Sequence, residues 1–212
     1  MPDASEILAG LTEIANRAIV VAVVWHVLIA GAAVALGRGW RPQADVAATL
    51  LASLPASVAM LAIAQENWFT GVAFSAIAIA LLFLSTQLGW APVRAGAPLN
   101  KRIGIALVVF GYLYPHFLES MSPLIYLVAA PVGVVPCPTL AVVIGFTLLE
   151  AQRFSRSWVL VVSAAGLFYG AVGVLRLGVW LDVPLVLGAF VLLTTLVPVP
   201  RSKATMTAAS RA

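Results

Sequence analysis

The sequence predicts an all-α membrane protein: a polytopic bundle of seven transmembrane helices with a re-entrant or interfacial segment on its outer side. The first observation behind this prediction is composition, because 62% of the 212 residues are hydrophobic and only 9% are charged. A soluble domain has about 45–50% apolar and about 25% charged residues. The second is a mean hydropathy of +1.06, and the third is the placement of basic residues. The composition and the single cysteine exclude a soluble enzyme, a disordered chain and a disulfide scaffold.

The segment before the first apolar stretch, residues 1–17, predicts a short amphipathic surface helix. Its apolar side chains recur at helical spacing between Ile7 and Ile14. Asp3 and Glu6 have the separation of a capping box at the start of this helix. A cleaved signal peptide needs a basic leader, and this segment is acidic overall. We therefore expect the N-terminus to be retained.

Seven apolar stretches follow, and together they predict one integral membrane domain over residues 18–199. A transmembrane helix needs about 20 mostly apolar residues, because the hydrocarbon core is roughly 30 Å thick and a helix rises about 1.5 Å per residue. The stretches are Ala18–Leu36, Ala47–Ala64, Phe69–Trp90, Ile103–Glu119, Thr139–Gln152, Trp158–Leu175 and Leu181–Val199. The tail, residues 200–212, is small and polar, which predicts a disordered cytoplasmic tail.

The basic residues orient the bundle, because Lys and Arg favour the cytoplasmic side. With seven spans and the N-terminus outside, ten of the twelve Lys and Arg lie in cytoplasmic segments. These are Arg38, Arg41, Arg94, Lys101, Arg102, Arg153, Arg156, Arg201, Lys203 and Arg211. This split predicts a cytoplasmic C-terminus in the inner (cytoplasmic) membrane. The net charge of +4 comes from these loops, so membrane lipid and not nucleic acid is the expected partner.

An additional apolar stretch, Pro123–Val135, decides the parity of the spans after it. At about a dozen residues it has the length of a re-entrant or interfacial segment. If it crossed the membrane as an eighth span, Arg153, Arg156 and the basic tail would lie outside. We interpret the stretch as re-entrant, and an eighth span remains the alternative.

Small residues indicate how one span associates with its neighbours. Ser163, Gly166, Gly170 and Gly173 follow one another at three or four residues and line one face of the sixth span. Gly166 and Gly170 form a GxxxG pair, which is typical of close helix contacts in membranes. This face therefore predicts a tightly packed helix neighbour.

Ionisable and soft side chains at membrane depth are costly, so they are candidates for function. A rise of about 1.5 Å per residue from the cytoplasmic anchors places His116 and Cys137 at similar depth below the outer boundary. His26 lies slightly deeper in the same half of the bilayer, and Glu119 follows His116 by three residues on the same predicted helix face. The polar groups therefore gather in the outer leaflet.

Cys137 occupies an unusual position, because Thr139–Gln152 is too short to cross the core as a helix alone. Pro138 suits a first helical turn, and Pro136 prevents a helix from entering from upstream. Cys137 then lies at or beside a helix N-cap, next to Thr139. The positive end of the helix dipole favours the thiolate there, which binds soft metals or attacks electrophiles.

Each candidate also has a purely structural interpretation. A single membrane cysteine is usually an inert, small apolar residue. His116 with Glu119 suits a metal ion but also a hydrogen-bonded cap near the interface, and His26 suits a hydrogen bond between helices. Arg176 and Asp182 are expected to form an ion pair at the outer surface or to reach the headgroups.

The second half of the chain also contains a distinctive order of residues. The order is Gly111, Tyr114, Pro115, Gly133, Val135, Pro136, Cys137, Pro138, Thr139, Gly145, Leu148 and Leu149, followed by Tyr169, Gly170, Ala171, Gly178, Asp182 and Leu185. It resembles the central signature of an uncharacterised family of bacterial multi-pass membrane proteins, a domain of unknown function with a Pro-Cys-Pro-Thr motif. The resemblance implies an integral bacterial membrane protein with no established activity, and it singles out Cys137.

Three functional hypotheses follow. The leading one is a small permease or channel-like protein for a small solute or a soft transition-metal ion, with its site formed by Cys137, Thr139, His116 and Glu119. The second is a membrane-embedded thiol or metal-dependent enzyme that uses the same residues, and the third is a structural or assembly subunit without a site. No predicted span contains a lysine for a retinal Schiff base, and the sequence has no HExxH, P-loop or GxSxG motif.

Overall fold

The structure is a computed structural model that describes residues 3–92, 97–119, 122–150 and 154–197. These residues form an all-α protein, as predicted, with nine α-helices. The helices are α1 (Ala4–Arg17), α2 (Ile19–Gly37), α3 (Ala44–Ala64), α4 (Trp68–Ser85), α5 (Pro98–Tyr112), α6 (Tyr126–Ala129), α7 (Pro136–Leu149), α8 (Arg156–Ala171) and α9 (Val183–Thr194). The predicted tail 200–212 lies outside the described residues, as do Arg94 and Arg153.

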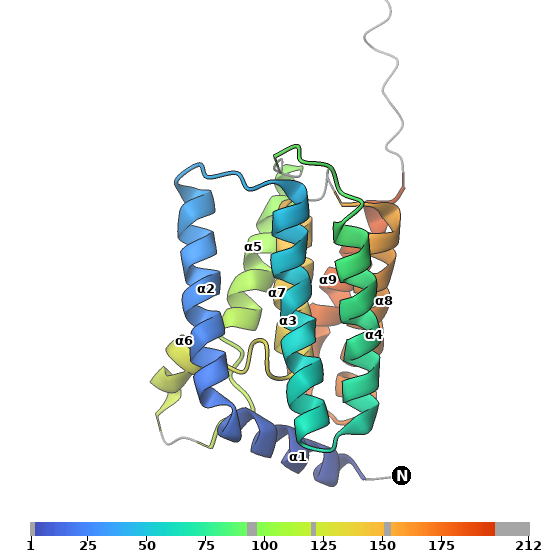
Figure 1. The fold of residues 1–212 in the computed structure, drawn as a ribbon. Helices are drawn as coiled ribbons and strands as arrows, with labels where there is room; N and C mark the ends of the chain where they lie inside the picture. The colour runs from blue at the N-terminus through green and yellow to red at the C-terminus, as the bar shows by residue number, and fades with distance from the viewer. Residues whose placement is uncertain (1–2, 93–96, 120–121, 151–153, 198–212) are drawn as a thin grey trace, which may run out of the picture.

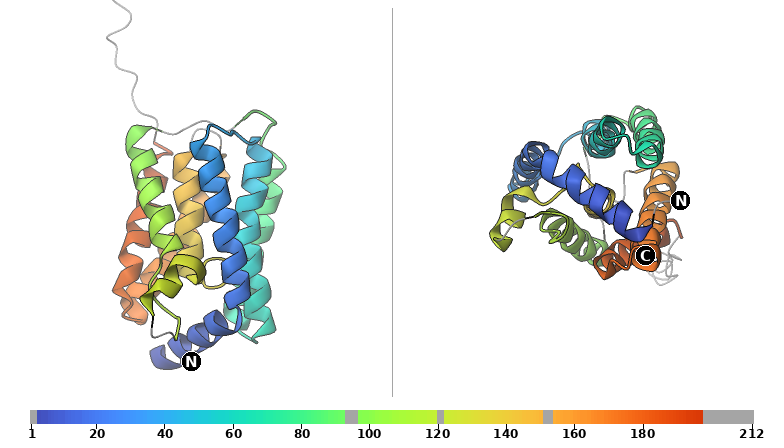
Figure 2. Two further views of the ribbon diagram at one scale, coloured as in Figure 1. Left: turned by 90° about the vertical axis from the view of Figure 1, so that its left-hand side faces the viewer. Right: turned by 90° about the horizontal axis from the view of Figure 1, so that it is seen from below.

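The long helices run roughly along one common axis, and α1 lies across one end of the bundle (Figure 1). Figure 2 shows the same end from below, with α1 crossing the ends of the other helices. We call this the α1 end. The opposite end carries the connection between α2 and α3 and the C-terminal end of α7.

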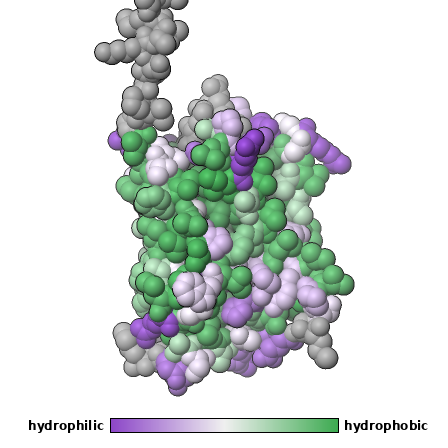
Figure 3. Space-filling model, turned by 180° about the vertical axis from the view of Figure 1, so that it is seen from behind, coloured by the Kyte–Doolittle hydropathy of each residue, from purple (hydrophilic) through white to green (hydrophobic). Residues whose placement is uncertain are grey.

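Four helices are long and apolar enough to cross a membrane: α2, α3, α4, and α8 with its continuation to Arg176. Their outer faces expose large apolar side chains, among them Val27, Met60 and Val72. Figure 3 shows that hydrophobic residues cover most of the middle of one face and that hydrophilic residues gather toward its two ends. This distribution is that of a multi-pass membrane protein.

The helix expected over Ile103–Glu119 ends earlier, because α5 stops at Tyr112. Residues 113–119 are irregular. Pro115 has no N–H for a helical hydrogen bond and restricts the residue before it, which explains the early end. The expectation that His116 and Glu119 share a helix face is therefore wrong.

Helix α7 occupies the centre of the bundle, although it has only 14 residues. All of its residues except Cys137 and Leu149 are buried. Glycines allow α5 to approach it closely, because a Cβ added to Gly104 would lie 2.6 Å from the carbonyl oxygen of Gly145. In Figure 1, α7 begins inside the bundle, above the lower ends of α3 and α4.

The Pro123–Val135 segment forms no helix longer than the four residues of α6. After α6 the chain turns inward, and its residues 130–135 are buried. Gly133 has φ +72°, and the Trp25 ring packs directly against its Cα, where a Cβ would collide. The segment thus joins the α1 end to the buried start of α7 without a spanning helix.

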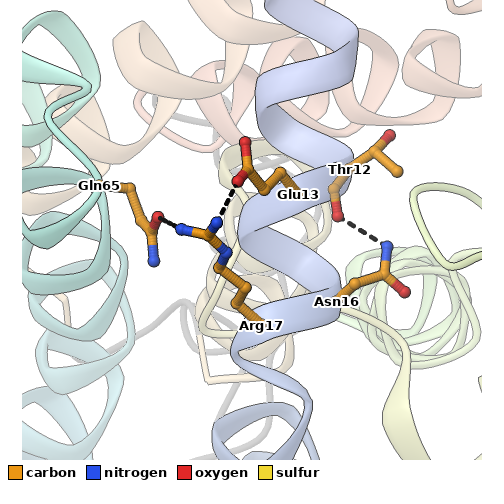
Figure 4. Close-up of polar contacts among 5 residues, drawn as sticks. All are labelled: Thr12, Glu13, Asn16, Arg17 and Gln65. Atoms are coloured by element: carbon orange, nitrogen blue, oxygen red, sulfur yellow. Dashed lines mark hydrogen bonds and ion pairs between the residues drawn. The ribbon is translucent and has the colours of Figure 1, made fainter.

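Helix α1 begins with the expected capping box, in which Asp3 accepts the Glu6 N–H at 2.8 Å and Glu6 accepts the Asp3 N–H at 3.0 Å. At its other end, Arg17 forms an ion pair with Glu13 at 2.6 Å and donates a hydrogen bond of 3.1 Å to Gln65 (Figure 4). Because Gln65 follows α3, this bond ties α1 to the bundle.

Candidate functional site

The site is centred on Asp182, whose side chain is only 2% exposed. It stands at the end of a short 3-10 turn, Trp180–Asp182, just before α9. The hydroxyl of Tyr114, which is 0% exposed, donates a hydrogen bond of 2.7 Å to Oδ1 of Asp182. Tyr114 follows α5, so the bond joins two distant parts of the chain.

The chain between α8 and α9 is shaped to bring Asp182 inward. After α8 it widens into a π-helical turn, Val172–Arg176, and Gly178 reverses it at φ +70°. The Val179 N–H then donates a hydrogen bond of 2.8 Å to the Gly173 carbonyl. The Asp182 carboxylate packs so closely on Gly173 that a Cβ there would overlap Oδ2. Single-turn π segments of this kind are frequent at functional sites.

Cys137 lies in the first turn of α7, two residues after the N-cap Val135. Its side chain packs against both apolar clusters of the protein, the large one around α7 and the smaller one beneath α1. The thiol is also close enough to the Asp182 carboxylate for the two side chains to interact. Cys137, Asp182 and Tyr114 therefore form one cluster, which we call the acid cluster.

Thr139 forms hydrogen bonds with the backbone beside this cluster. Its hydroxyl accepts a hydrogen bond of 2.8 Å from the Gly133 N–H and donates one of 2.7 Å to the Val135 carbonyl. Pro136 and Pro138 are buried in the first turn of α7, where a missing N–H has no cost. These residues hold the buried entry into α7 in place.

His116 and Glu119 lie apart from each other. The His116 ring packs on Phe117, with ring centroids 4.3 Å apart, and is near enough to Asp182 for an electrostatic interaction. Glu119 is exposed, and its backbone N–H donates to the Asn16 side chain of α1 at 3.1 Å. It lines a surface hollow together with Arg17 of α1. His116 thus borders the acid cluster, whereas Glu119 belongs to the exposed surface beside α1.

His26 makes a hydrogen bond between helices. Its Nε2 lies 2.8 Å from the Tyr112 carbonyl oxygen at the end of α5, and its Nδ1 lies 2.9 Å from the Ala22 carbonyl oxygen. The neighbouring Trp25 donates from Nε1 to the Ser57 hydroxyl of α3 at 3.1 Å. This geometry matches the structural interpretation of His26.

The glycine pair of α8 faces α9 and, at Gly166, also Ile144 of α7. A Cβ added to Gly166 would meet Ala189 at 3.0 Å, and one added to Gly170 would meet Val186 at 2.7 Å. Arg176 is exposed while Asp182 is buried. The ion pair between Arg176 and Asp182 stays a prediction.

Sequence reasoning missed the partner of Asp182 and a further buried phenol. Sequence patterns point to Tyr114 only through the family resemblance, and they do not single out the hydroxyl of Tyr169 of α8. Tyr169 is 8% exposed, and its hydroxyl has no hydrogen-bond partner by geometry among the described residues. A tyrosine within an apolar span is itself a signal of a buried polar contact, because buried tyrosine hydroxyls usually require a hydrogen-bond partner.

The described residues hold no group of three or more His, Cys, Asp and Glu side chains that could bind a metal ion. A soft metal ion at the acid cluster would therefore have only Cys137 and Asp182 as ligands of these four residue types. No protein-family model, curated protein or solved structure matches the chain. The resemblance to the Pro-Cys-Pro-Thr family accordingly stays a prediction.

Proposed function

We propose that the chain is a small permease or channel-like protein of the bacterial cytoplasmic membrane, with seven spans and its N-terminus outside. Helices α5, α7 and α9 are shorter than a full span. They run beside the four long apolar helices in Figure 1. The described flanking residues 113–119, 122–135 and 172–182 extend the path of the chain at the α1 end, which supports counting each short helix as a span.

The observation that carries the proposal is the burial of Asp182 inside an apolar helix bundle. Ionisable residues at membrane depth are rare and mark solute or ion pathways. A carboxylate, a phenol and a thiol together offer oxygen and sulfur atoms to a ligand. Because the carboxylate brings one negative charge, we infer that the solute is a small cation, with soft ions favoured by the thiol of Cys137.

Access to the acid cluster requires a rearrangement, because Asp182 and Tyr114 are exposed by only 2% and 0%. The π-helical turn Val172–Arg176 and the turn at Gly178 are the adjacent irregular backbone. Irregular backbone at membrane depth occurs where it lines a cavity or a solute path. We infer that this turn moves when the site opens.

The test uses the full chain reconstituted in liposomes that contain a thallium-sensitive dye, with Tl⁺ as a soft monovalent probe. We expect Tl⁺ influx above that of empty liposomes and a loss of at least about tenfold in Asp182→Asn, because the substitution removes the charge that binds the ion. Glu119→Gln, at the exposed surface beneath α1, is the matched control and should keep the flux. Influx that is equal in Asp182→Asn and wild type would contradict the proposal.

The proximity of the thiol to the carboxylate favours a second candidate, a membrane-embedded thiol enzyme in which Asp182 is the base for Cys137. The rate of Cys137 alkylation by a small maleimide separates the two. A base that deprotonates the thiol makes Asp182→Asn slower to react. In the permease, the negative charge disfavours the thiolate, so Asp182→Asn should react faster.

A further inference from the structure

A groove of about 150 Å³ lies between α2, α3 and the C-terminal end of α7. Its walls are almost entirely apolar and include Trp25 and Leu36 of α2 and Leu54 of α3. Leu28 and Leu50 also border it, and they are 54% and 55% exposed. The groove therefore opens on the outer surface of the bundle, where the hydrocarbon core of a membrane would lie.

The length of the groove matches one leaflet of a bilayer. From Trp25 to Leu36 it follows α2 over about 16 Å, given about 1.5 Å per residue. This is half of a hydrocarbon core of roughly 30 Å. One acyl chain of a lipid in a single leaflet has this reach and this chemistry.

The groove ends at a carboxylate. Glu150, which follows α7, lines it and is only 9% exposed. Its Oε2 is buried and has no hydrogen-bond partner among the described residues. A buried carboxylate oxygen without a donor is costly. Glu150 is therefore suited to accept a hydrogen bond from a donor that lies at the end of the apolar groove.

A guanidinium lies at the same end. Arg41 and Lys101 both act electrostatically on Glu150. Nη1 of Arg41 donates hydrogen bonds of 2.7 Å to the carbonyl oxygens of Leu36 and Trp40. Leu36 and Trp40 both line the groove. A guanidinium carries five N–H donors on three nitrogens, so Arg41 has further donors for an anionic group such as a phosphate.

We propose that this groove binds a phospholipid with a primary ammonium headgroup, phosphatidylethanolamine. One acyl chain lies along Trp25 to Leu36, the ammonium donates to Oε2 of Glu150, and the phosphate accepts from Arg41. In this arrangement one lipid brings a hydrogen-bonding cation to Glu150 and an anion to Arg41. Trp40 lies at the same end, where an indole suits the boundary between headgroups and chains.

The two polar groups select this headgroup over other common ones. Phosphatidylcholine carries the same charges, but its quaternary ammonium has no N–H to donate to Glu150. Phosphatidylglycerol has no ammonium, so it offers Glu150 neither a positive charge nor a charged N–H donor. The expected preference over phosphatidylcholine is about tenfold, the value of one charge-assisted hydrogen bond.

The experiment measures lipid binding to the full chain in detergent by native mass spectrometry, with thermal unfolding in the same lipids as a second readout. Phosphatidylethanolamine and phosphatidylcholine with identical acyl chains are the probes. Wild type should bind phosphatidylethanolamine about tenfold more tightly and unfold at a higher temperature with it. Glu150→Gln should bind the two lipids equally, whereas Glu119→Gln should keep the preference.

A second pair of variants tests the apolar part of the site. Ala32→Phe places a ring in the groove and should weaken the binding of both lipids, whereas Ala33→Phe, on the exposed side of α2, should not. Unfolding without lipid shows whether each variant is folded. Equal binding of the two lipids to wild type, tighter binding of phosphatidylglycerol, or a preference that survives in Glu150→Gln would overturn the proposal.

Discussion

The hydroxyl of Tyr114 donates a hydrogen bond of 2.7 Å to Oδ1 of Asp182, across 68 positions of sequence. The bond connects the irregular chain after α5 with the turn before α9. Both side chains are buried, and Cys137 of α7 lies beside them. The bond therefore lies where three segments of the chain meet. This relationship defines the candidate site and leads to the first prediction.

Tyr114→Phe should destabilise the protein by about 1–3 kcal/mol, because it leaves a buried carboxylate without its phenol donor. The measurement is thermal or denaturant unfolding of the purified protein in detergent. Tyr112→Phe is the matched control, since the backbone carbonyl of Tyr112, and not its hydroxyl, binds His26. Equal stability of Tyr114→Phe and wild type would show that the bond to Asp182 contributes nothing.

Gly173→Ala should destabilise the protein by about 1–3 kcal/mol, the range for an overpacked core. The added methyl group would collide with the Asp182 carboxylate and displace it from Tyr114. Gly31→Ala in α2 is the control, because a Cβ there meets no atom within 4 Å. Unfolding in detergent compares the two, and a Gly173→Ala protein as stable as Gly31→Ala would contradict the close packing.

Thr139→Val keeps the shape of the side chain but removes the hydroxyl that binds Gly133 and Val135. We expect a loss of about 1–3 kcal/mol, because the buried Gly133 N–H loses its acceptor. Faster hydrogen exchange at Gly133, measured by mass spectrometry, should accompany the loss. Thr194→Val, at an exposed position of α9, should leave both the stability and this exchange unchanged.

The orientation is tested by labelling single cysteines in a Cys137→Ser background in intact cells. A cysteine at Gln65, near the α1 end, should react with a membrane-impermeant maleimide from outside. A cysteine at Ser155, before α8, should react only after the membrane is made permeable, because the basic residues around it favour the cytoplasm. Labelling of Ser155→Cys from outside would contradict this orientation.

The capping box of α1 predicts a dependence on pH. Hydrogen bonds from the Ser5 hydroxyl and the Glu6 N–H hold the pKa of the exposed Asp3 carboxyl below its ordinary value of 3.8. Its stabilisation of α1 is therefore fully present above pH 3.8 and is lost as the pH falls through the lower, folded value. A carboxyl NMR titration measures this pKa, and Ser5→Ala should raise it toward the ordinary value. An unchanged pKa in Ser5→Ala would exclude the hydroxyl as its cause.

Part of the site could be predicted from the sequence. The prolines on either side of Cys137 and the short stretch that follows predict a helix that begins inside the bundle, and α7 begins at Pro136. The choice of Cys137 followed from the same local rules. The partners of Cys137 could not be predicted, because the expected helix through Glu119 put His116 and Glu119 on one helix face, whereas α5 ends at Tyr112.

The amino-acid sequence alone predicts the class of this protein, an apolar all-α chain with basic loops and a capped amphipathic N-terminal helix. Composition, proline positions and capping pairs act over a few residues, so their consequences are visible in the order of the amino acids. The burial of Asp182 against Tyr114 and Gly173, and the position of Glu150 in a groove between α2 and α3, become visible only in the folded protein. These contacts join segments far apart in the chain, and they depend on how helices of similar apolar composition pack against one another.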